Sequence, residues 1–451
     1  MTRRVAVIGG GITGLTAAAE LAHRGADVTL FEASQRLGGK LRTEEFAGRA
    51  VDVGADAFLG RQRHAKELAE QLGFTAALRA PIESTVWLAI EGQLRQLPSG
   101  TFFGIPTRLG PVAGSQVLSA RALWQVATEP VRARGDRWRG DASVAAIVAQ
   151  RFGTEVVDRL VEPLLGGVYA GRADQLSAEA TIPPLAAAAQ QGGSLRRGLR
   201  RRAPSGDNDD PVFLTIQGGL GRLVDALATR IPDTRLASPV SSVVPASGGW
   251  SVVTDGGEHT VDAVVLAVPA YAAADIVEDL SPAATRELGA MRYASVAVAS
   301  LALPTTALRR VPRGSGLLVP RSAGRLVKAV TWSSWKWPHH AAAEGQFLLR
   351  ASVGRIDAPP PDVDDEVLVE RIVRDLSQIA GVAASPTAWR VTRWDRSLPQ
   401  YEVGHRDRVE RIKAAVQRDA PGIVLAGAAY DGVGVAHCVR QGQEAAATLL
   451  V

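Results

Sequence analysis

The sequence predicts an α/β protein whose main sheet is parallel and is assembled from separated parts of the chain. Three observations predict this class. The N-terminal stretch RRVAVIGGGITGLTAAAELAHRGADVTLFEA has the pattern strand, glycine-rich turn, helix and strand. Short strand patterns return over residues 212–270, and residues 422–450 form an apolar strand, a glycine-rich loop and a helix. Alternation of strands with helices is typical of a parallel sheet covered by helices.

The composition describes a large globular protein and argues against several classes. With 451 residues, 46% of them hydrophobic and 22% charged, the chain should form two or three domains. A net charge of +5 is small for this length and gives no argument for nucleic acid, and we expect no metal site. The single cysteine, Cys438, cannot form an internal disulfide, which favours a reducing compartment.

The apolar runs of the sequence favour a cytoplasmic protein. The N-terminal residues show no signal-peptide pattern. The longest apolar run, AVVLAVPAYAAA, lies between Asp262 and Asp275, is too short to cross a bilayer and is interrupted by Pro269. We therefore expect a cytoplasmic location with at most peripheral contact with a membrane, and no transmembrane segment.

Three glycines after the first strand form the motif G-x-G-x-x-G. Residues 5–8 are predicted to form a buried strand and residues 12–22 a helix, so Gly9, Gly11 and Gly14 mark the turn between them. Gly9 permits the tight turn, Gly11 lets a pyrophosphate approach the backbone, and Gly14 lets the helix pack on the strand. The helix N-terminus offers unpaired N–H groups to the phosphates. The motif therefore predicts a dinucleotide site.

An acidic residue follows at the position that such a site requires. Residues 28–31 are predicted to form a second strand that ends at Glu32, eighteen residues after Gly14. A carboxylate at the tip of this strand can accept hydrogen bonds from both hydroxyls of an adenosine ribose. Because strand, loop, helix, strand and acid are all in register, an ordinary glycine turn explains the segment poorly.

The next stretch, SQRLGGKLRTEEF, distinguishes between the possible dinucleotides. It places Arg36, a glycine pair that ends at Gly39, and Lys40 just beyond the ribose acid. This arrangement resembles the R-x-G-G element of the flavin-containing amine oxidase superfamily. The resemblance implies that FAD is bound in an extended form with a second contact to its diphosphate, which nicotinamide dehydrogenases lack. FAD is therefore favoured over NAD.

The resemblance also implies where the other FAD contacts lie. The turn in VDVGADAFLG passes beside the flavin ring, Val240 contacts the adenine, and Trp394 lies against the flavin site. The C-terminal loop and helix close the site at the N1/C2=O edge of the ring, where a helix dipole stabilises negative charge. The expected cofactor-binding residues are Gly9, Gly10, Gly11, Ile12, Thr13, Gly14, Glu32, Ala33, Arg36, Gly39, Lys40, Gly54, Ala55, Asp56, Ala57, Val240, Trp394, Gly427, Val433, Gly434 and Val435.

The stretch GAAYDGVGVAHCVRQG contains the adjacent pair His437 and Cys438, which invites a nucleophile or metal interpretation. No third partner is evident in the sequence, and a helix that begins near Val435 places both residues about one turn inside it. Gly432 and Gly434 explain the segment by letting backbone N–H groups reach a ligand. We therefore expect Cys438 to be a small packing residue.

Five further stretches narrow the family. They are LPSGTFFGIPT (97–107), EPLLGGVYAGRADQLS (162–177), WSSWKWPHH (332–340), LLRASVGR (348–355) and RWDRSLPQYEVGH (393–405). With the C-terminal stretch, they resemble the protoporphyrinogen/coproporphyrinogen oxidase family over essentially the whole chain except the segment near 196–210. The resemblance implies six-electron oxidation of a porphyrinogen in three rounds. Each round transfers a hydride to flavin N5, and O2 reoxidises the flavin with release of H2O2. No catalytic side chain is expected, because orientation over the flavin does most of the catalysis.

The resemblance favours one of two porphyrinogens as the substrate. The stretch GTFFGIPT is similar to the coproporphyrinogen-type enzymes of Gram-positive bacteria, whereas the mitochondrial protoporphyrinogen type has a propionate-binding arginine where this sequence has Phe102. We expect oxidation of coproporphyrinogen III to coproporphyrin III in haem biosynthesis, with protoporphyrinogen IX as the alternative. An amine oxidase is less favoured because tyrosine is scarce. A flavin-binding protein with a structural or porphyrin-chaperone role is a further alternative.

Candidate substrate residues come from the same stretches and from charge. They are Arg61, Phe102, Tyr169, Lys336 and Arg350, with Arg63 and Arg355 as further candidates. Arginine suits propionates because its planar fork binds carboxylates bidentately, and Lys336 resembles the lysine that some flavin oxidases place near N5. The expected partners are the porphyrinogen, O2 and, transiently, the next enzyme of the haem pathway.

The expected architecture is a discontinuous Rossmann-type FAD-binding domain, an antiparallel-sheet substrate domain and an inserted helical domain. The FAD-binding domain comprises residues 1–85, 206–284 and 389–451, the substrate domain 86–107 and 285–388, and the helical domain 108–205. The basic stretch RRGLRRRAPSGDNDD, residues 196–210, is expected to be a solvated mobile loop. An electrostatic lure for an anionic substrate or a partner is the alternative.

Overall fold

A computed structural model describes residues 2–133, 137–202, 211–342 and 345–450 of the chain. Contacts within the chain divide it into two compact units. Unit 1 consists of Met1–Ala80, Asp210–Arg292 and Arg406–Val451, and unit 2 consists of Pro81–Asp209 and Tyr293–His405. Each unit is therefore discontinuous in sequence. The finer division into three domains stays a prediction.

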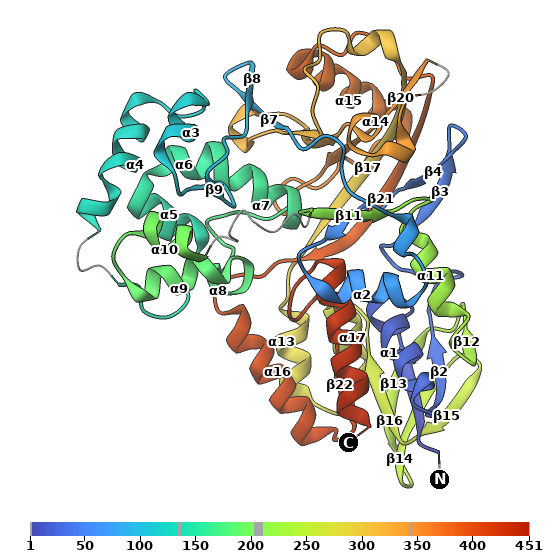
Figure 1. Ribbon diagram of the computed structural model, residues 1–451. Helices are drawn as coiled ribbons and strands as arrows, with labels where there is room; N and C mark the ends of the chain where they lie inside the picture. The colour runs from blue at the N-terminus through green and yellow to red at the C-terminus, as the bar shows by residue number, and fades with distance from the viewer. Residues whose placement is uncertain (1, 134–136, 203–210, 343–344, 451) are drawn as a thin grey trace. The chain divides into compact units, whose positions relative to one another are not determined.

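Unit 1 contains the first two strands and the last helix of the chain, as the labels in Figure 1 show. Its helices are α1 (Ile12–His23), α2 (Arg63–Gln71), α11 (Gly221–Ala228), α12 (Ala270–Ile276), α13 (Pro282–Gly289), α16 (His405–Asp419), α17 (Val435–Leu449) and the 3₁₀ turn η1 (Thr75–Ala77). Its strands are β1 (Arg4–Ile8), β2 (Asp27–Phe31), β3 (Thr43–Phe46), β4 (Arg49–Asp52), β5 (Phe58–Leu59), β6 (Leu78–Arg79), β11 (Phe213–Ile216), β12 (Asp233–Arg235), β13 (Val240–Ala246), β14 (Gly249–Thr254), β15 (Gly257–Val261), β16 (Ala263–Leu266) and β22 (Ile423–Leu425).

The main sheet of unit 1 is parallel, in the strand order β12-β2-β1-β16-β22. All four residues of β16 are buried, and only the first residue of β1 is exposed. Such continuous burial is typical of parallel strands that are covered on both faces. The sheet joins strands from three distant parts of the chain, which confirms the α/β class and the return of residues near 263 and 423 to the N-terminal sheet.

The strand after residue 212 does not join this sheet. β11 pairs antiparallel with β5 and with β6 instead. The next three strands, β13, β14 and β15, form a separate antiparallel sheet. The β5-β11-β6 sheet therefore ties the first two pieces of unit 1 together, in addition to the parallel sheet that joins all three.

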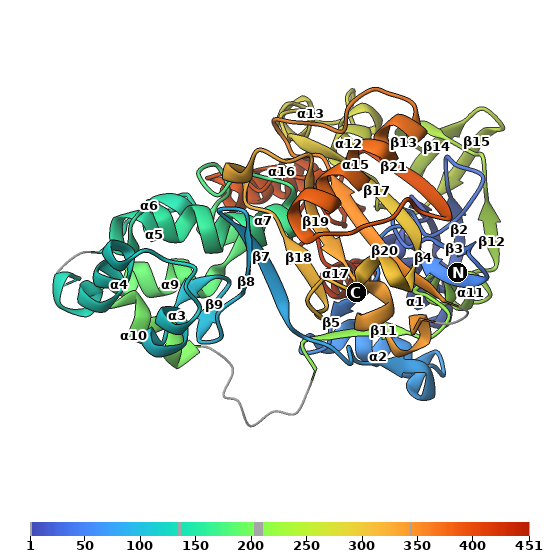
Figure 2. The ribbon, with the colours of Figure 1, turned by 90° about the horizontal axis from the view of Figure 1, so that it is seen from above.

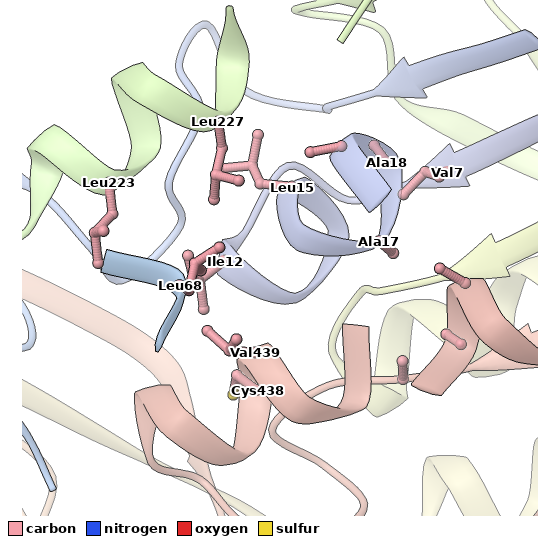
Figure 3. Close-up of a cluster of buried hydrophobic side chains, with 14 of the residues drawn as sticks. Val7, Ile12, Leu15, Ala17, Ala18, Leu68, Leu223, Leu227, Cys438 and Val439 are labelled. Carbon is pink, nitrogen blue, oxygen red and sulfur yellow. The ribbon is translucent and has the colours of Figure 1, made fainter. Parts of the chain in front are cut away.

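Helices α1 and α17 pack closely in the hydrophobic core of unit 1. Cys438 and Val439 of α17 lie beside Ile12 of α1 and Leu68 of α2 in Figure 3. A Cβ atom added to Gly442 of α17 would lie 2.5 Å from the carbonyl oxygen of Thr13, so only glycine allows this approach. The alanine-rich sequence of α1 has the same cause, because nine of its residues are buried against neighbouring elements.

Unit 2 contains a large sheet and most of the helices in the middle of the chain. Its helices are α3 (Leu109–Gly114), α4 (Ala120–Arg132), α5 (Val144–Phe152), α6 (Thr154–Val156), the π-helical η2 (Val157–Val161), α7 (Glu162–Tyr169), α8 (Ala178–Thr181), α9 (Pro183–Gln191), α10 (Leu195–Arg202), α14 (Ser333–Lys336), α15 (Asp365–Ala380) and the 3₁₀ turns η3 (Thr305–Leu308), η4 (Arg321–Ala323) and η5 (Pro338–His340). Its strands are β7 (Val86–Ile90), β8 (Gln93–Gln96), β9 (Thr101–Phe102), β10 (Ile105–Pro106), β17 (Tyr293–Pro304), β18 (Gly316–Leu318), β19 (Val327–Thr331), β20 (Gln346–Val353) and β21 (Ala388–Pro399).

The sheet of unit 2 has seven strands in the order β21-β17-β20-β19-β18-β7-β8. Every neighbouring pair is antiparallel except β18 and β7. Apolar residues of α15, including Leu368 and Ile372, pack with apolar residues of the strands in one buried cluster. The predicted antiparallel sheet is thus present, and β21 belongs to it.

The helices α3 to α10 gather together within unit 2, as the two views in Figures 1 and 2 show. The prediction of a mobile loop at 196–210 is wrong for residues 196–202, which belong to α10. Leu195 and Leu199 of α10 are buried. The carboxylate of Glu129 accepts hydrogen bonds from the N–H of Leu195 (2.7 Å) and the hydroxyl of Ser194 (2.6 Å), which anchors the start of the helix. Residues 203–210 lie outside the described part.

Candidate functional site

The glycines of the G-x-G-x-x-G motif have the separate functions that their spacing predicts. Gly9 has a φ of +106°, and a Cβ atom there would lie 2.6 Å from the carbonyl oxygen of Ala267. A Cβ atom on Gly14 would lie 1.9 Å from the carbonyl oxygen of Gly9, so helix α1 could not pack so closely on β1. A Cβ atom on Gly11 would meet no atom within 4 Å. Gly11 therefore borders open space, whereas Gly9 and Gly14 are required by close neighbours.

This open space lies at the N-terminus of helix α1. Gly11 is the N-cap residue, and no side chain caps the helix there. The first N–H groups of a helix have no partner within the helix, and they carry its partial positive charge. The region can therefore accept an anionic group such as a diphosphate.

Glu32 lies at the end of β2 and holds the glycine loop in place. One carboxylate oxygen accepts a hydrogen bond from the N–H of Gly10 (2.7 Å). The other accepts hydrogen bonds from the N–H (2.9 Å) and the hydroxyl (2.7 Å) of Ser34. Each carboxylate oxygen has two lone pairs, so the oxygen bound to Gly10 keeps one acceptor position for a ribose hydroxyl.

The R-x-G-G element lies directly beside the first glycine loop. Gly11 and Gly38 form a parallel β-bridge, and the N–H of Gly38 donates to the carbonyl of Gly10 at 2.8 Å. Arg36 donates to the carbonyl of Gly39 at 2.8 Å, which fixes the turn of the element. Burial lowers the pKa of this guanidinium, and nearby Arg42 lowers it further. Two glycine turns are therefore joined into one backbone surface.

The turn that contains Gly54 to Ala57 lies next to this surface. The N–H of Ala55 donates to the carbonyl of Lys40 at 3.0 Å. Lys40 is half-buried, and burial lowers the pKa of its ammonium group. A positive charge here that gains an anionic neighbour would be stabilised. Gly54, Ala55, Asp56 and Ala57 are all half-buried and border the same loop.

Val240 lies close in space to Glu32, although the two residues are far apart in the sequence. The N–H of Ser238, two residues before Val240, donates to the carbonyl of Glu32 at 2.9 Å. The N–H of Ala237 donates to the carbonyl of Ser34 at 2.8 Å. These bonds place the start of β13 beside the end of β2, where an adenosine contact is expected.

The C-terminal loop is held by a glutamine that sequence reasoning missed. Gln441 of α17 is 5% exposed, accepts a hydrogen bond from the N–H of Gly427 (3.2 Å) and donates to the carbonyl of Asp431 (3.2 Å). A glutamine directly before a glycine in the helical stretch QGQEAAATLL was the available signal. Helix α17 begins at Val435, and its N-cap Gly434 has no side chain to cap it. A second uncapped helix N-terminus therefore borders the loop that contains Val433.

The adjacent pair of histidine and cysteine is a packing arrangement. Cys438 is 6% exposed, and burial raises the pKa of its thiol. His437 instead contacts Gln62, with 3.1 Å between the side-chain nitrogens. A Cβ atom on Gly432 would lie 2.4 Å from Cγ of His437, so the imidazole packs against this turn. A thiol that burial keeps protonated is a poor nucleophile, which agrees with the predicted packing role.

These features together fit an extended dinucleotide. Two uncapped helix N-termini, an acid at the end of β2 and the joined glycine turns are all formed within unit 1. The space at Gly11 would be lost to any larger side chain, as expected where a diphosphate approaches the backbone. The sequence motifs and the geometry therefore point to the same kind of ligand.

Comparisons with known proteins identify the family. The model of the family described as flavin containing amine oxidoreductase matches residues 12–450. The chain belongs to this family. A coproporphyrinogen III oxidase of Bacillus subtilis is 32% identical, with 99% of this chain and 98% of that protein aligned. One from Mycobacterium tuberculosis is 37% identical over 97% of this chain and 95% of that protein.

A solved structure agrees with this membership of the flavin containing amine oxidoreductase family. A protein from Exiguobacterium sp. 255-15, assigned as a protoporphyrinogen oxidase, matches with a TM-score of 0.89 at 32% identity and covers 100% of this chain and 99% of that one. A redesigned triple mutant of putrescine oxidase matches with a TM-score of 0.74 at 18% identity, which shows a shared fold. The resemblance stated from the motifs is confirmed, and the chain is an oxidoreductase with FAD as cofactor.

The structure places the candidate substrate residues in different environments. Arg61 of unit 1 is exposed. Phe102 of unit 2 is half-buried and meets Phe103 edge to face, with 5.3 Å between ring centroids. Tyr169 is 8% exposed, and burial raises its pKa to about 12. Lys336 places its Nζ 4.6 Å from the ring centroid of Trp337.

For four further candidate residues, contact with the cofactor or the substrate remains a prediction. Arg350 is half-buried on β20, and Trp394 lies on β21 opposite Val296 of β17. Arg63 is exposed at the start of α2, whereas Arg355 is 9% exposed. Sequence reasoning did not single out the nearby Lys328, although a lysine inside the apolar strand pattern RLVKAVTW was a signal.

No helix in the described ranges of the chain is both long enough and apolar enough to cross a membrane.

We expect Glu32→Gln to weaken FAD binding by roughly tenfold or more. The amide keeps one acceptor oxygen but turns an NH₂ group toward the N–H donor of Gly10 or Ser34, so at least one of these hydrogen bonds is lost. Titration of the FAD-free protein, followed by flavin fluorescence, measures the change. Glu20→Gln on α1, where the carboxylate pairs with surface Arg24, is the matched control. Equal FAD affinity in the two variants would contradict this role.

Proposed function

We propose that the protein oxidises coproporphyrinogen III to coproporphyrin III in haem biosynthesis. The observation that carries the proposal is the near full-length similarity to bacterial proteins named coproporphyrinogen III oxidase, at 30% to 37% identity. Phe102, in the place where the mitochondrial type has its propionate-binding arginine, supports the same substrate. Each round removes two electrons and two protons, and three rounds with O2 give three molecules of H2O2.

Within unit 1, we assign the FAD contacts to the backbone surface described above. The N–H groups at the start of α1 and the Lys40 ammonium would hold the diphosphate, and Glu32 would hold the ribose. The N-terminus of α17 at Val435 would face the electron-rich edge of the ring. When bound, FAD supplies the two-electron acceptor and its reaction with O2.

The protein itself would contribute orientation rather than proton transfer. In unit 2, Tyr169 is a buried phenol whose pKa is raised to about 12, so it stays protonated and can only donate or accept a hydrogen bond near neutral pH. The half-buried Phe102 offers an apolar ring to a macrocycle. These properties suit a substrate that must be positioned and that loses its protons readily after hydride removal.

The decisive experiment is porphyrin fluorescence in air. We expect FAD-loaded protein to convert coproporphyrinogen III with a kcat/KM at least about tenfold above that for protoporphyrinogen IX. FAD-free protein gives the rate of spontaneous oxidation. Without O2, coproporphyrinogen III should bleach the flavin absorbance by a single turnover. A preference for protoporphyrinogen IX would instead assign that substrate.

One comparison supports the alternative that the protein oxidises protoporphyrinogen IX. A chloroplastic protoporphyrinogen oxidase of rice is 30% identical over 98% of this chain and 87% of that protein. The fluorescence assay separates the two substrates directly. A protein that binds FAD but turns over neither porphyrinogen would remove both. A cytoplasmic location and a transient contact with the next haem-pathway enzyme belong to the same proposal.

A further inference from the structure

Two cationic side chains of unit 2, Lys328 and Arg355, lie close together. Lys328 has no acidic partner among the described residues. Lys328 of β19 is only 4% exposed, and no hydrogen bond or ion pair of its ammonium group is found within residues 2–133, 137–202, 211–342 and 345–450. Arg355, just after β20, is 9% exposed. We refer to Lys328 and Arg355 as the cation pair. Buried charges without a partner are rare because desolvation is costly.

Val319 connects the two members of the cation pair. Its N–H donates to the carbonyl of Lys328 at 2.9 Å, and its carbonyl accepts a hydrogen bond from Nη2 of Arg355 at 3.0 Å. The guanidinium has five N–H donors, and this is its single described side-chain bond. The remaining donors are therefore available beside a second positive charge.

The two carboxylates that act electrostatically on Arg355 are already engaged by another arginine. Glu162 of α7 and Asp357 both contact Arg321 of η4, at 3.0 Å and 2.6 Å. Glu162 also accepts a hydrogen bond from the N–H of Ala173 at 2.7 Å. On α15, Asp375 accepts a hydrogen bond from the N–H of Leu326 at 2.8 Å. Glu162 and Asp357 therefore favour the charge of Arg355 only from a distance, and among the described residues no acid acts on Lys328.

We propose that the cation pair is a carboxylate-binding subsite that receives one propionate of the porphyrinogen. This inference rests on the proposed function, because it assigns a site to a group of that substrate. A carboxylate would bridge the free donors of Arg355 and the ammonium of Lys328, which supplies the anion that the protein does not. Coproporphyrinogen III has four propionates and protoporphyrinogen IX two, so such a subsite can contribute to substrate choice.

Binding at this subsite should be coupled to a proton. Burial and the charge of Arg355 lower the pKa of Lys328 to about 7. A bound carboxylate favours the ammonium form, so above pH 7 the complex must take up a proton. Affinity should then fall by up to about tenfold for each pH unit above 7. The propionates themselves stay ionised over this range.

The test is fluorescence titration of coproporphyrin III into FAD-loaded protein at pH 6.5, 7.5 and 8.5. At pH 6.5 we expect Lys328→Met and Arg355→Met each to weaken binding by at least about tenfold. Lys328→Met should also abolish the decrease in affinity at higher pH. Lys413→Met and Arg371→Met, at exposed positions of α16 and α15, are matched controls that should behave as wild type.

The outcomes separate this inference from the proposed function. If wild type oxidises coproporphyrinogen III while Lys328→Met binds coproporphyrin III as tightly and with the same pH dependence, the subsite is wrong and the function stands. If wild type neither oxidises the porphyrinogen nor binds the porphyrin, both fail. Lys328→Met removes an uncompensated buried charge, so it should fold at least as stably as wild type. Its unfolding midpoint verifies this in the same preparation.

Discussion

Gly11→Ala should give a protein that folds almost as well as wild type but does not retain FAD. The backbone at Gly11, with φ −71° and ψ 174°, suits alanine, and the added Cβ atom meets no atom within 4 Å. Loss of the glycine N-cap should cost less than about 1 kcal/mol of folding free energy. The methyl group would occupy the space that lets a diphosphate reach the helix N–H groups. We expect FAD affinity to fall by roughly 100-fold, because charge-assisted hydrogen bonds are lost.

Gly14→Ala is the informative companion, because it should fail for a different reason. Its Cβ atom would lie 1.9 Å from the carbonyl oxygen of Gly9 and 3.2 Å from Cβ of Ala267, so α1 must move away from β1. Overpacking of this kind costs about 1–3 kcal/mol or more. Gly289→Ala, at the end of α13 where a Cβ atom meets nothing within 4 Å, is the control.

The flavin-to-protein absorbance ratio of purified protein and the unfolding midpoint together test both substitutions. Gly11→Ala should have a lower flavin-to-protein ratio than wild type but the same unfolding midpoint as FAD-free wild type. Gly14→Ala should lower both. If Gly11→Ala retained FAD at the wild-type ratio, the assignment of the diphosphate to the start of α1 would be wrong.

The N-terminal part of the fold was predictable because its constraints are local. A tight turn, a close helix contact and an acid at a strand end each need a particular residue at a fixed spacing, as Gly9, Gly14 and Glu32 show. The parallel sheet could be extended to distant strands because buried strands such as β16 are apolar throughout. The prediction of a mobile loop at 196–202 was wrong because the run of arginines obscures the helical spacing of Leu195 and Leu199. In addition, Glu129, which anchors the helix, lies far away in the sequence.

Local patterns gave only a weak signal for the missed residues of the candidate sites, because their roles depend on contacts between distant parts of the chain. Gln441 holds Gly427 across the loop, and Gly442 is required only because Thr13 of another helix approaches it. Lys328 belongs to none of the motifs that the sequence analysis considered. Its importance comes from its burial beside Arg355 and from the engagement of Glu162 and Asp357 by Arg321, which only the folded chain reveals. Propionate-binding arginines could not be chosen from sequence for the same reason.

Lys328 should also give the protein a stability that rises with pH, independently of any ligand. Its folded-state pKa of about 7 lies below the ordinary value of 10.5. Below pH 7 the lysine is protonated in both states, so the cost of burying its charge is constant. Between pH 7 and about 10 only the unfolded chain holds the proton, and the free energy of unfolding therefore rises with pH. Since each pKa unit is worth about 1.4 kcal/mol, the gain is a few kcal/mol.

Lys328→Met removes this titration and retains an unbranched apolar side chain of similar length. Other groups titrate in the same range, so the useful quantity is the difference between variant and wild type. In urea unfolding at pH 6.5, 8 and 9.5, we expect the variant to be more stable at pH 6.5 and its advantage to shrink as the pH rises. Lys413→Met, at an exposed position, should follow wild type throughout. A difference that stays constant with pH would mean that Lys328 is charged in the folded protein up to pH 9.5. Since a lysine so buried holds its charge only with a partner, an anion or an acidic group would then already compensate it.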